Sequence, residues 1–158
     1  MTSLDRARWL ALAIPAALLG GAYASQYVGG LYPCEMCHWQ RWPHMAAIVL
    51  AVAALALRQS ALSRPLILLA AVAIAVSGAI GVFHAGVEYG WWQGVTGCAA
   101  PMSATNAEDM LAEIMATPLI RCDVAQWTLA GVSLAGFNAI FSLGGALAVL
   151  VLATRRGS

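Results

Sequence analysis

The sequence contains no lysine, and its eight basic residues are all arginines that nowhere gather into a run. Without a basic cluster the chain lacks the charged surface that binds nucleic-acid phosphates. Charged residues of both signs make up only 9% of the chain, whereas 61% of it is hydrophobic. A soluble domain of this size needs more polar residues to cover its surface, so the composition indicates an integral membrane protein.

Internal repeats and disordered linkers are also missing, so we expect one domain over residues 1–158. About 20 residues of helix cross the ~30 Å hydrocarbon core of a bilayer. The apolar run from Trp42 to Leu57 reaches this length only if its helix begins near Cys37. We therefore predict an all-α bundle of four transmembrane helices, at about 9–28, 38–57, 65–87 and 127–153.

The arginines predict the orientation of these helices. Six of the eight fall in the segments that the bundle places on one side, and the positive-inside rule makes that side cytoplasmic. The cytoplasmic segments are then the tails 1–8 and 154–158 and the connection 58–64, and the periplasmic loops are about 29–37 and 88–126. All four cysteines lie at the outer side, where disulfides persist in bacteria.

The first apolar segment has a competing interpretation. Its basic start, apolar middle and A-x-A-like end, "AYAS", are also typical of a cleavable signal peptide. Because the segment is long enough to anchor the chain, we expect it to be retained as the first helix of the bundle.

The second outer loop is too long to serve only as a connection, and loops of this length are usually functional. Within it, "TNAEDMLAEIMATP" (105–118) predicts a short amphipathic helix. Thr105 and Glu108 fit a capping box, an apolar stripe follows, and Pro118 ends the helix. This helix would lie on the membrane surface or dock onto the bundle or a partner.

The stretch "PCEMCHWQR" (33–41) carries the main chemical signal, and it has two interpretations. Cys34, Cys37 and His38 form the C-x-x-C-H signature of c-type haem attachment, while the two cysteines alone form a dithiol redox motif. Haem attachment leaves Cys98 and Cys122 without a task. A tetrathiolate zinc site is weaker, because 23 residues separate this second pair. A third alternative is that the four cysteines form two disulfides that only stabilise the fold.

The redox interpretation uses all four cysteines. A C-x-x-C pair at a helix start gains thiolate stability from free backbone N–H groups and the helix dipole. Arg41 lies four residues after Cys37, on the same helix face, and adds a permanent positive charge, whereas Glu35 opposes it.

The loop cysteines fit an exchange relay with this pair. Cys98, in the small-residue stretch "TGCAAP", is placed for attack by another protein's thiolate. Exchange then needs Cys122 as a resolving partner that also reaches Cys34.

Together, the motifs C-x-x-C-x-x-Q-R and R-C-D-x-x-x-W, the four apolar segments and the cysteine order resemble the DsbB family of disulfide bond formation proteins over nearly the whole chain. The resemblance implies a membrane thiol oxidoreductase of the bacterial inner membrane. Its electron acceptor would be a membrane quinone, ubiquinone or menaquinone. Its partner would be a periplasmic thioredoxin-fold oxidase of the DsbA type.

The resemblance also implies a route for the electrons. The partner attacks a Cys98–Cys122 disulfide at Cys98, and the freed Cys122 attacks a Cys34–Cys37 disulfide at Cys34. Cys37 leaves as a thiolate that faces the quinone, and Arg41 stabilises this thiolate and the developing quinone oxyanion.

Two further residues are candidates for contact with the quinone. His84 and Glu88 lie four apart at the outer end of the third predicted helix and could face the quinone or carry its protons, with simple solvation as the alternative. Asn138, inside the fourth apolar segment, is expected to hydrogen bond to another helix.

Two other functions stay open from the sequence. One is a membrane-anchored c-type haem electron carrier that uses Cys34, Cys37 and His38. The other is a quinone reductase resembling vitamin K epoxide reductase, although in those relatives the loop cysteines precede the C-x-x-C, whereas here they follow it.

Overall fold

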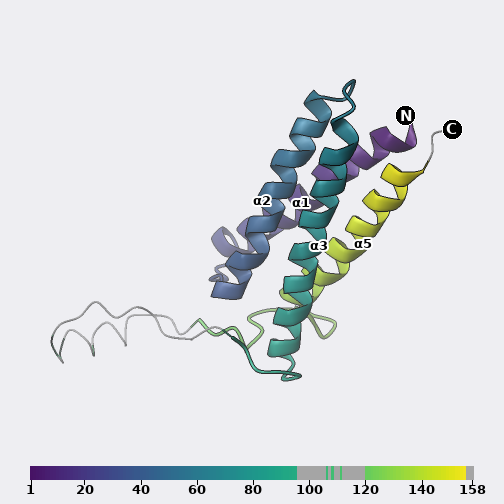
Figure 1. Ribbon diagram of the computed structural model, residues 1–158. Coiled ribbons are helices and arrows are strands. Elements are labelled where there is room, and N and C mark those ends of the chain that lie inside the picture. Colours follow the sequence, from purple (N-terminus) through teal and green to yellow (C-terminus); the bar gives the residue numbers. More distant parts are fainter. Residues whose placement is uncertain (96–105, 107, 109–110, 112–119, 156–158) are drawn as a thin grey trace.

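Four long helices form a bundle in the computed structural model, which describes residues 1–95, 106, 108, 111 and 120–155 (Figure 1). Three of the helices, α1 (Ser3–Tyr27), α3 (Ser63–Glu88) and α5 (Leu134–Thr154), are long and apolar enough to cross a membrane. The other, α2 (Glu35–Ala56), has 22 residues but a polar first half. The fold is that of a helical integral membrane protein. Cys98 and almost all of the predicted amphipathic helix 105–118 lie outside the described residues.

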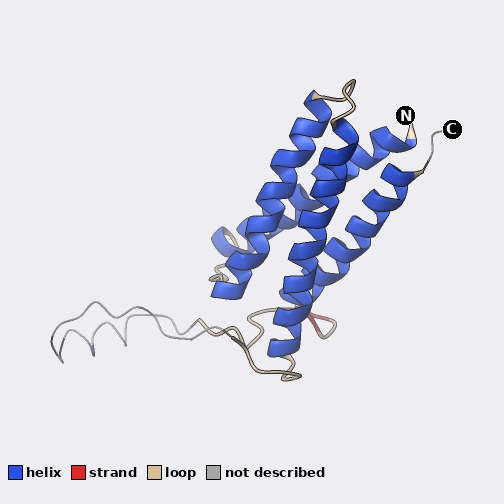
Figure 2. Cartoon of the chain, in the orientation of Figure 1, coloured by secondary structure: helices blue, strands red, loops and turns tan. Residues whose placement is uncertain are grey.

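Helix α3 packs mainly against α2 and α5, and α1 packs against the same two helices. Both chain ends and the α2–α3 connection lie at one end of the bundle (Figure 1). The start of α2 lies at the opposite end. A short antiparallel pair, β1 (Thr128–Leu129) and β2 (Val132–Ser133), also lies there, ahead of α5 (Figure 2). This arrangement brings the C-x-x-C motif and the chain around Cys122 to the same end.

The helices begin where capping side chains allow. Thr2 and Asp5 form a capping box, so the first helix starts at residue 3 and not near 9. The Cys34 side chain caps α2, so the second helix starts at Glu35 and not at 38.

The largest correction concerns the predicted helix 127–153. Its first seven residues are not helical, because Ala130 (φ 51°) and Gly131 (φ 79°) form a hairpin turn with two positive φ angles. Ser133 then accepts a hydrogen bond from the Gly136 N–H and caps α5.

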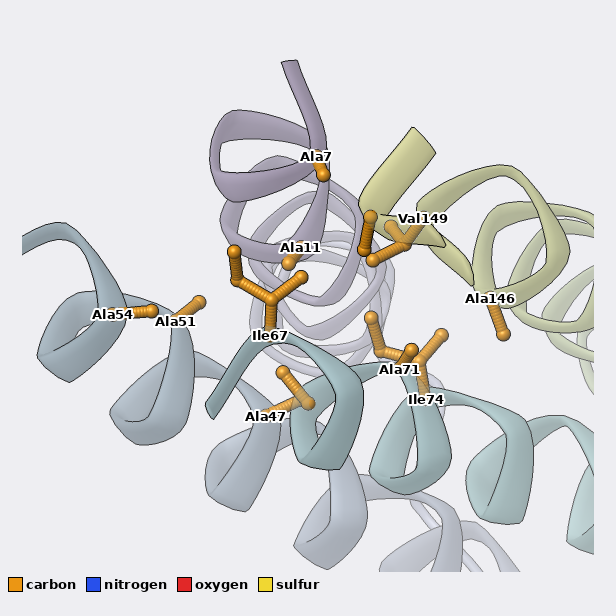
Figure 3. Packing of buried hydrophobic residues seen from close by; sticks show 12 residues of the cluster. Ala7, Ala11, Ala47, Ala51, Ala54, Ile67, Ala71, Ile74, Ala146 and Val149 are labelled. Carbon is orange, nitrogen blue, oxygen red and sulfur yellow. The ribbon is translucent and has the colours of Figure 1, made fainter. Parts of the chain in front are cut away.

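The end of the bundle near the termini has a core made mostly of alanine. Small side chains let the helix backbones approach closely, and Ile67, Ile74 and Val149 fill the remaining space. Figure 3 shows these residues facing one another from all four helices.

Gly81 marks a close approach of α3 to α5. A Cβ added there would lie 3.0 Å from both Ala135 O and Ala139 N, which are backbone atoms that cannot move aside easily. We predict that Gly81→Ala lowers the free energy of unfolding by about 1–3 kcal/mol, measured by denaturant titration in detergent micelles. The control is Gly144→Ala, since nothing lies within 4 Å of that added Cβ. Equal stability of the two variants would contradict this packing.

Candidate functional site

The C-x-x-C pair occupies the first turn of α2. The Cys37 N–H donates to Cys34 Sγ at 3.3 Å, and the two sulfur atoms lie 2.8 Å apart. The hydrogen bond with Cys37, followed by burial, raises the pKa of Cys34. Cys34 therefore keeps its proton and donates it toward Cys37, whose sulfur sits at the positive end of the helix dipole.

Cys122 lies against the same pair, although it is distant in the sequence. The sulfur atoms of Cys34 and Cys122 and a ring nitrogen of His84 all lie within 4.8 Å of one another. All three residues are buried, and Met36 and Val87 complete the surrounding cluster. The structure thus brings the third cysteine to Cys34, as a thiol exchange between them requires.

An ion pair flanks Cys122 along the chain. Arg121 donates two hydrogen bonds to the Asp123 carboxylate, at 2.8 and 2.6 Å, and these bonds lower the pKa of Asp123. Because both side chains are exposed, the pair adds little stability. The pair joins the two residues on either side of Cys122 in the R-C-D motif.

Arg41 is buried and ties α2 to α1. Its guanidinium donates to Gln26 Oε1 at 2.6 Å and to Ala22 O at 3.2 Å, and it lies 4.9 Å from the centre of the Tyr23 ring. These three contacts hold the positive charge on the helix face that also carries Cys37.

One cavity of about 290 Å³ joins these groups. Its wall is mostly apolar and includes side chains of α1 and α5, which is typical of a site for a small organic molecule. All the residues predicted to contact a cofactor line this cavity, together with Cys34: Cys37, Arg41, His84 and Glu88.

The side chains of His84 and Glu88 are only 3% and 7% exposed. His84 Nε2 lies 3.7 Å from Glu88 Oε1 and 3.5 Å from Cys34 Sγ. Glu88 Oε2 is buried without a hydrogen-bond partner among the described residues. The simple solvated interpretation of these two residues is therefore wrong.

A buried polar network lies behind the cavity, and sequence reasoning found only part of it. Asn138 bonds to another helix as expected: its Nδ2 donates to Gln40 Oε1 at 2.8 Å and to Ser77 O at 3.1 Å. No role was predicted for Gln40, or for His44, whose Nε2 lies 2.9 Å from Asn138 Oδ1. The signal for both was available, since polar residues inside an apolar helix are rare and need partners.

The group formed by Cys34, His84 and Cys122 is also close enough to hold a metal ion. A ligating histidine normally donates its second ring N–H to an acceptor. Here the ring's Nδ1 meets Gln40 Nε2 at 2.8 Å, and that nitrogen also donates to Met36 O at 3.2 Å. Nδ1 is therefore the acceptor and Nε2 carries the proton, which does not suit a metal ligand.

His38, the axial ligand that haem attachment would need, is exposed on α2 and does not line the cavity. The structure therefore gives the haem alternative no support, while it places both cysteines of the motif with their sulfurs together.

Comparison with known proteins gives a consistent result. The family model described as "Disulfide bond formation protein DsbB" matches residues 5–152. An uncharacterized protein of Rickettsia prowazekii (strain Madrid E), RP370, is 23% identical over 128 residues, which cover 79% of this chain and 73% of that protein. No solved structure matches this chain.

Proposed function

The chain belongs to the DsbB family of disulfide bond formation proteins and is therefore a membrane thiol oxidoreductase, and we propose that it reoxidises a periplasmic DsbA-type thiol oxidase with a membrane quinone as electron acceptor. Each cycle takes two electrons and two protons from the partner dithiol and produces one disulfide and one quinol. The observation that carries this proposal is the contact of Cys122 with Cys34, beside a cavity that Cys37 and Arg41 line.

The relay begins at the loop pair. A thiolate of the reduced partner attacks Cys98 of a Cys98–Cys122 disulfide, and the electron pair of the broken bond leaves on Cys122. This thiolate attacks Cys34 of a Cys34–Cys37 disulfide, and Cys37 leaves as the next thiolate. The second thiolate of the partner then displaces Cys98 from the mixed disulfide, which completes the partner's disulfide and leaves Cys98 as a thiolate. The 4.8 Å limit on the separation of the Cys34 and Cys122 sulfurs supports the second transfer.

The relay ends in the cavity. Cys37 presents its thiolate there, at the N-terminus of α2, and the guanidinium of Arg41 stabilises this charge and the negative charge that develops on a quinone oxygen. His84 and Glu88 line the same space and are the groups able to hold the protons that the quinol takes up. The apolar walls suit the ring and the start of the isoprenoid tail.

The proposed topology has four spans, with α2 as the fourth, in the bacterial inner membrane. Both termini and the α2–α3 connection would be cytoplasmic, and the cysteines periplasmic. The common position of the chain ends supports placing both termini on one side of the membrane (Figure 1). At that end Arg8 donates to Ser63 Oγ at 2.9 Å and to Arg58 O at 3.0 Å. These hydrogen bonds join the start of α1 to the α2–α3 connection and to the start of α3.

The proposal is tested by mixing the purified full-length protein with a reduced DsbA-type protein and either ubiquinone or menaquinone. We expect partner oxidation that depends on the quinone, with one quinol formed for each partner disulfide. Full turnover by a Cys98→Ser variant would contradict the relay, and oxidation without quinol formation would contradict the electron acceptor.

A further inference from the structure

The amide groups behind the redox pair have only one possible orientation. Asn138 Nδ2 contacts the backbone carbonyl of Ser77, and Gln40 Nε2 contacts the backbone carbonyl of Met36. Carbonyl oxygens only accept hydrogen bonds, so the atoms that face them must be the amide nitrogens. Turning either amide over would place two oxygens about 3 Å apart in a buried site, and buried polar groups without a partner are costly.

These two amides then determine which nitrogen of His84 carries the proton. Asn138 Nδ2 donates to Gln40 Oε1, and Gln40 Nε2 donates to His84 Nδ1, each at 2.8 Å. Since Nδ1 accepts, a neutral imidazole carries its proton on Nε2. That nitrogen lies 3.5 Å from Cys34 Sγ and 3.7 Å from Glu88 Oε1, and the ring also hydrogen bonds to the backbone of Cys122, so the Nε2 proton is shared between the redox sulfur and these two acceptors. Cys34 lies in turn 2.8 Å from Cys37.

We propose that Asn138 and Gln40 are positioning residues that hold His84 as an Nε2–H donor, so that a one-way chain of hydrogen bonds ends on the redox sulfurs and stabilises negative charge there. The donors follow one another from α5 through α2 and α3 to the cysteine pair: Asn138, Gln40, His84, Cys34 and then Cys37. Aligned donors polarise one another, so the chain strengthens its last hydrogen bond. The link to turnover rests on the proposed function.

The chain of hydrogen bonds would stabilise negative charge at two points of the relay. While Cys34 is protonated it donates to the Cys37 thiolate. When Cys98 re-forms its bond to Cys122, the Cys122–Cys34 bond breaks and its electron pair stays on Cys34, where the Nε2–H of His84 meets it. The same proton on Nε2 keeps the cluster of Cys34, His84 and Cys122 from closing around a metal ion.

The first test reads the tautomer directly and needs neither quinone nor partner. In the reduced full-length protein in micelles, ¹⁵N NMR of the histidine rings, assigned with a His84→Gln variant, should show His84 protonated at Nε2 and not at Nδ1. Gln40→Glu replaces the donor by an acceptor and should move a proton onto Nδ1. Ser142→Ala removes another donor to Asn138 (2.9 Å) without changing the direction of the chain and should leave the spectrum unchanged. A wild-type ring protonated at Nδ1 would overturn the proposal even if the Gln40→Glu variant did not fold.

The second test measures the charge that the chain stabilises. The rate of Cys37 alkylation by iodoacetamide, followed against pH by peptide mass, gives the midpoint of thiolate formation. His84→Leu removes the donor and should raise this midpoint by about one pH unit, while His84→Gln, whose amide can still donate, should restore most of the shift. Arg41, Glu88 and Arg121, the charged groups that line the cavity with Cys37, are unchanged in both variants. Equal midpoints for the His84→Leu and His84→Gln variants would contradict the proposal that His84 acts as a hydrogen-bond donor. Because neither test needs turnover, failure of the quinone relay would leave both results readable.

Discussion

Changing Cys122 to serine is expected to reduce quinone-dependent oxidation of the partner to the background rate. The reason is geometric. The sulfur of Cys122 lies within 4.8 Å of that of Cys34, although Cys122 lies outside the C-x-x-C motif. Serine occupies nearly the same volume in this buried position, but its hydroxyl is too weak a nucleophile to attack a disulfide.

The Cys122→Ser variant should still carry out the last half of the reaction. Its Cys34–Cys37 pair, once reduced by a small dithiol, should be reoxidised by added quinone in a single turnover at close to the wild-type rate, since Cys37, Arg41 and the cavity are unchanged. Stopped-flow absorbance of the quinone measures this step. Loss of the single turnover would contradict the assignment of the quinone step to Cys34 and Cys37. Retention of steady-state activity would contradict the assignment of the exchange step to Cys122.

Arg41→Met is expected to lower the rate of the quinone step by about 100-fold, the usual cost of removing a group that stabilises developing charge in a buried site. Methionine keeps an unbranched apolar stem but loses the charge and the donors. Arg41→Lys keeps the charge and should lose about tenfold. Single-turnover quinone reduction measures both, and the exchange between Cys122 and Cys34 should be unaffected.

A control separates the charge of Arg41 from its structural contacts. Gln26→Leu removes the 2.6 Å acceptor on α1 but leaves the guanidinium in place over Tyr23. We expect this variant to lose less than tenfold in the quinone step, although its stability falls because a partly buried charged hydrogen bond is lost. If Gln26→Leu were as slow as Arg41→Met, the role of Arg41 would be the positioning of α1.

The sequence predicted the parts of this site that depend on local pattern. The C-x-x-C motif lies in the first turn of a helix, and Arg41 follows Cys37 on the same face, because helical spacing of four residues is enough to place them. The cysteine order and the R-C-D motif predicted that Cys122 belongs with this pair. Family membership is confirmed over residues 5–152.

The sequence did not predict the features that depend on backbone conformation or on backbone groups of neighbouring helices. The hairpin before α5 was missed because positive φ at Ala130 is uncommon for alanine, although Gly131 and the capping Ser133 were visible signals. The direction of the amide chain could not be predicted either. It is set by two carbonyl groups, Met36 O and Ser77 O, and their positions follow from the packing of α2 against α3 and α5.

The contact of Cys122 with Cys34 is tested most directly by trapping it. In a Cys37→Ser variant, Cys34 has lost its partner, and its sulfur lies within 4.8 Å of that of Cys122. The account predicts that this variant contains a Cys34–Cys122 disulfide, identified by peptide mass spectrometry, with Cys98 left open to alkylation. The matched Cys34→Ser variant should keep Cys98 and Cys122 joined and leave Cys37 open. A Cys37→Ser protein in which Cys34 stays a free thiol, or pairs with Cys98, would contradict the account.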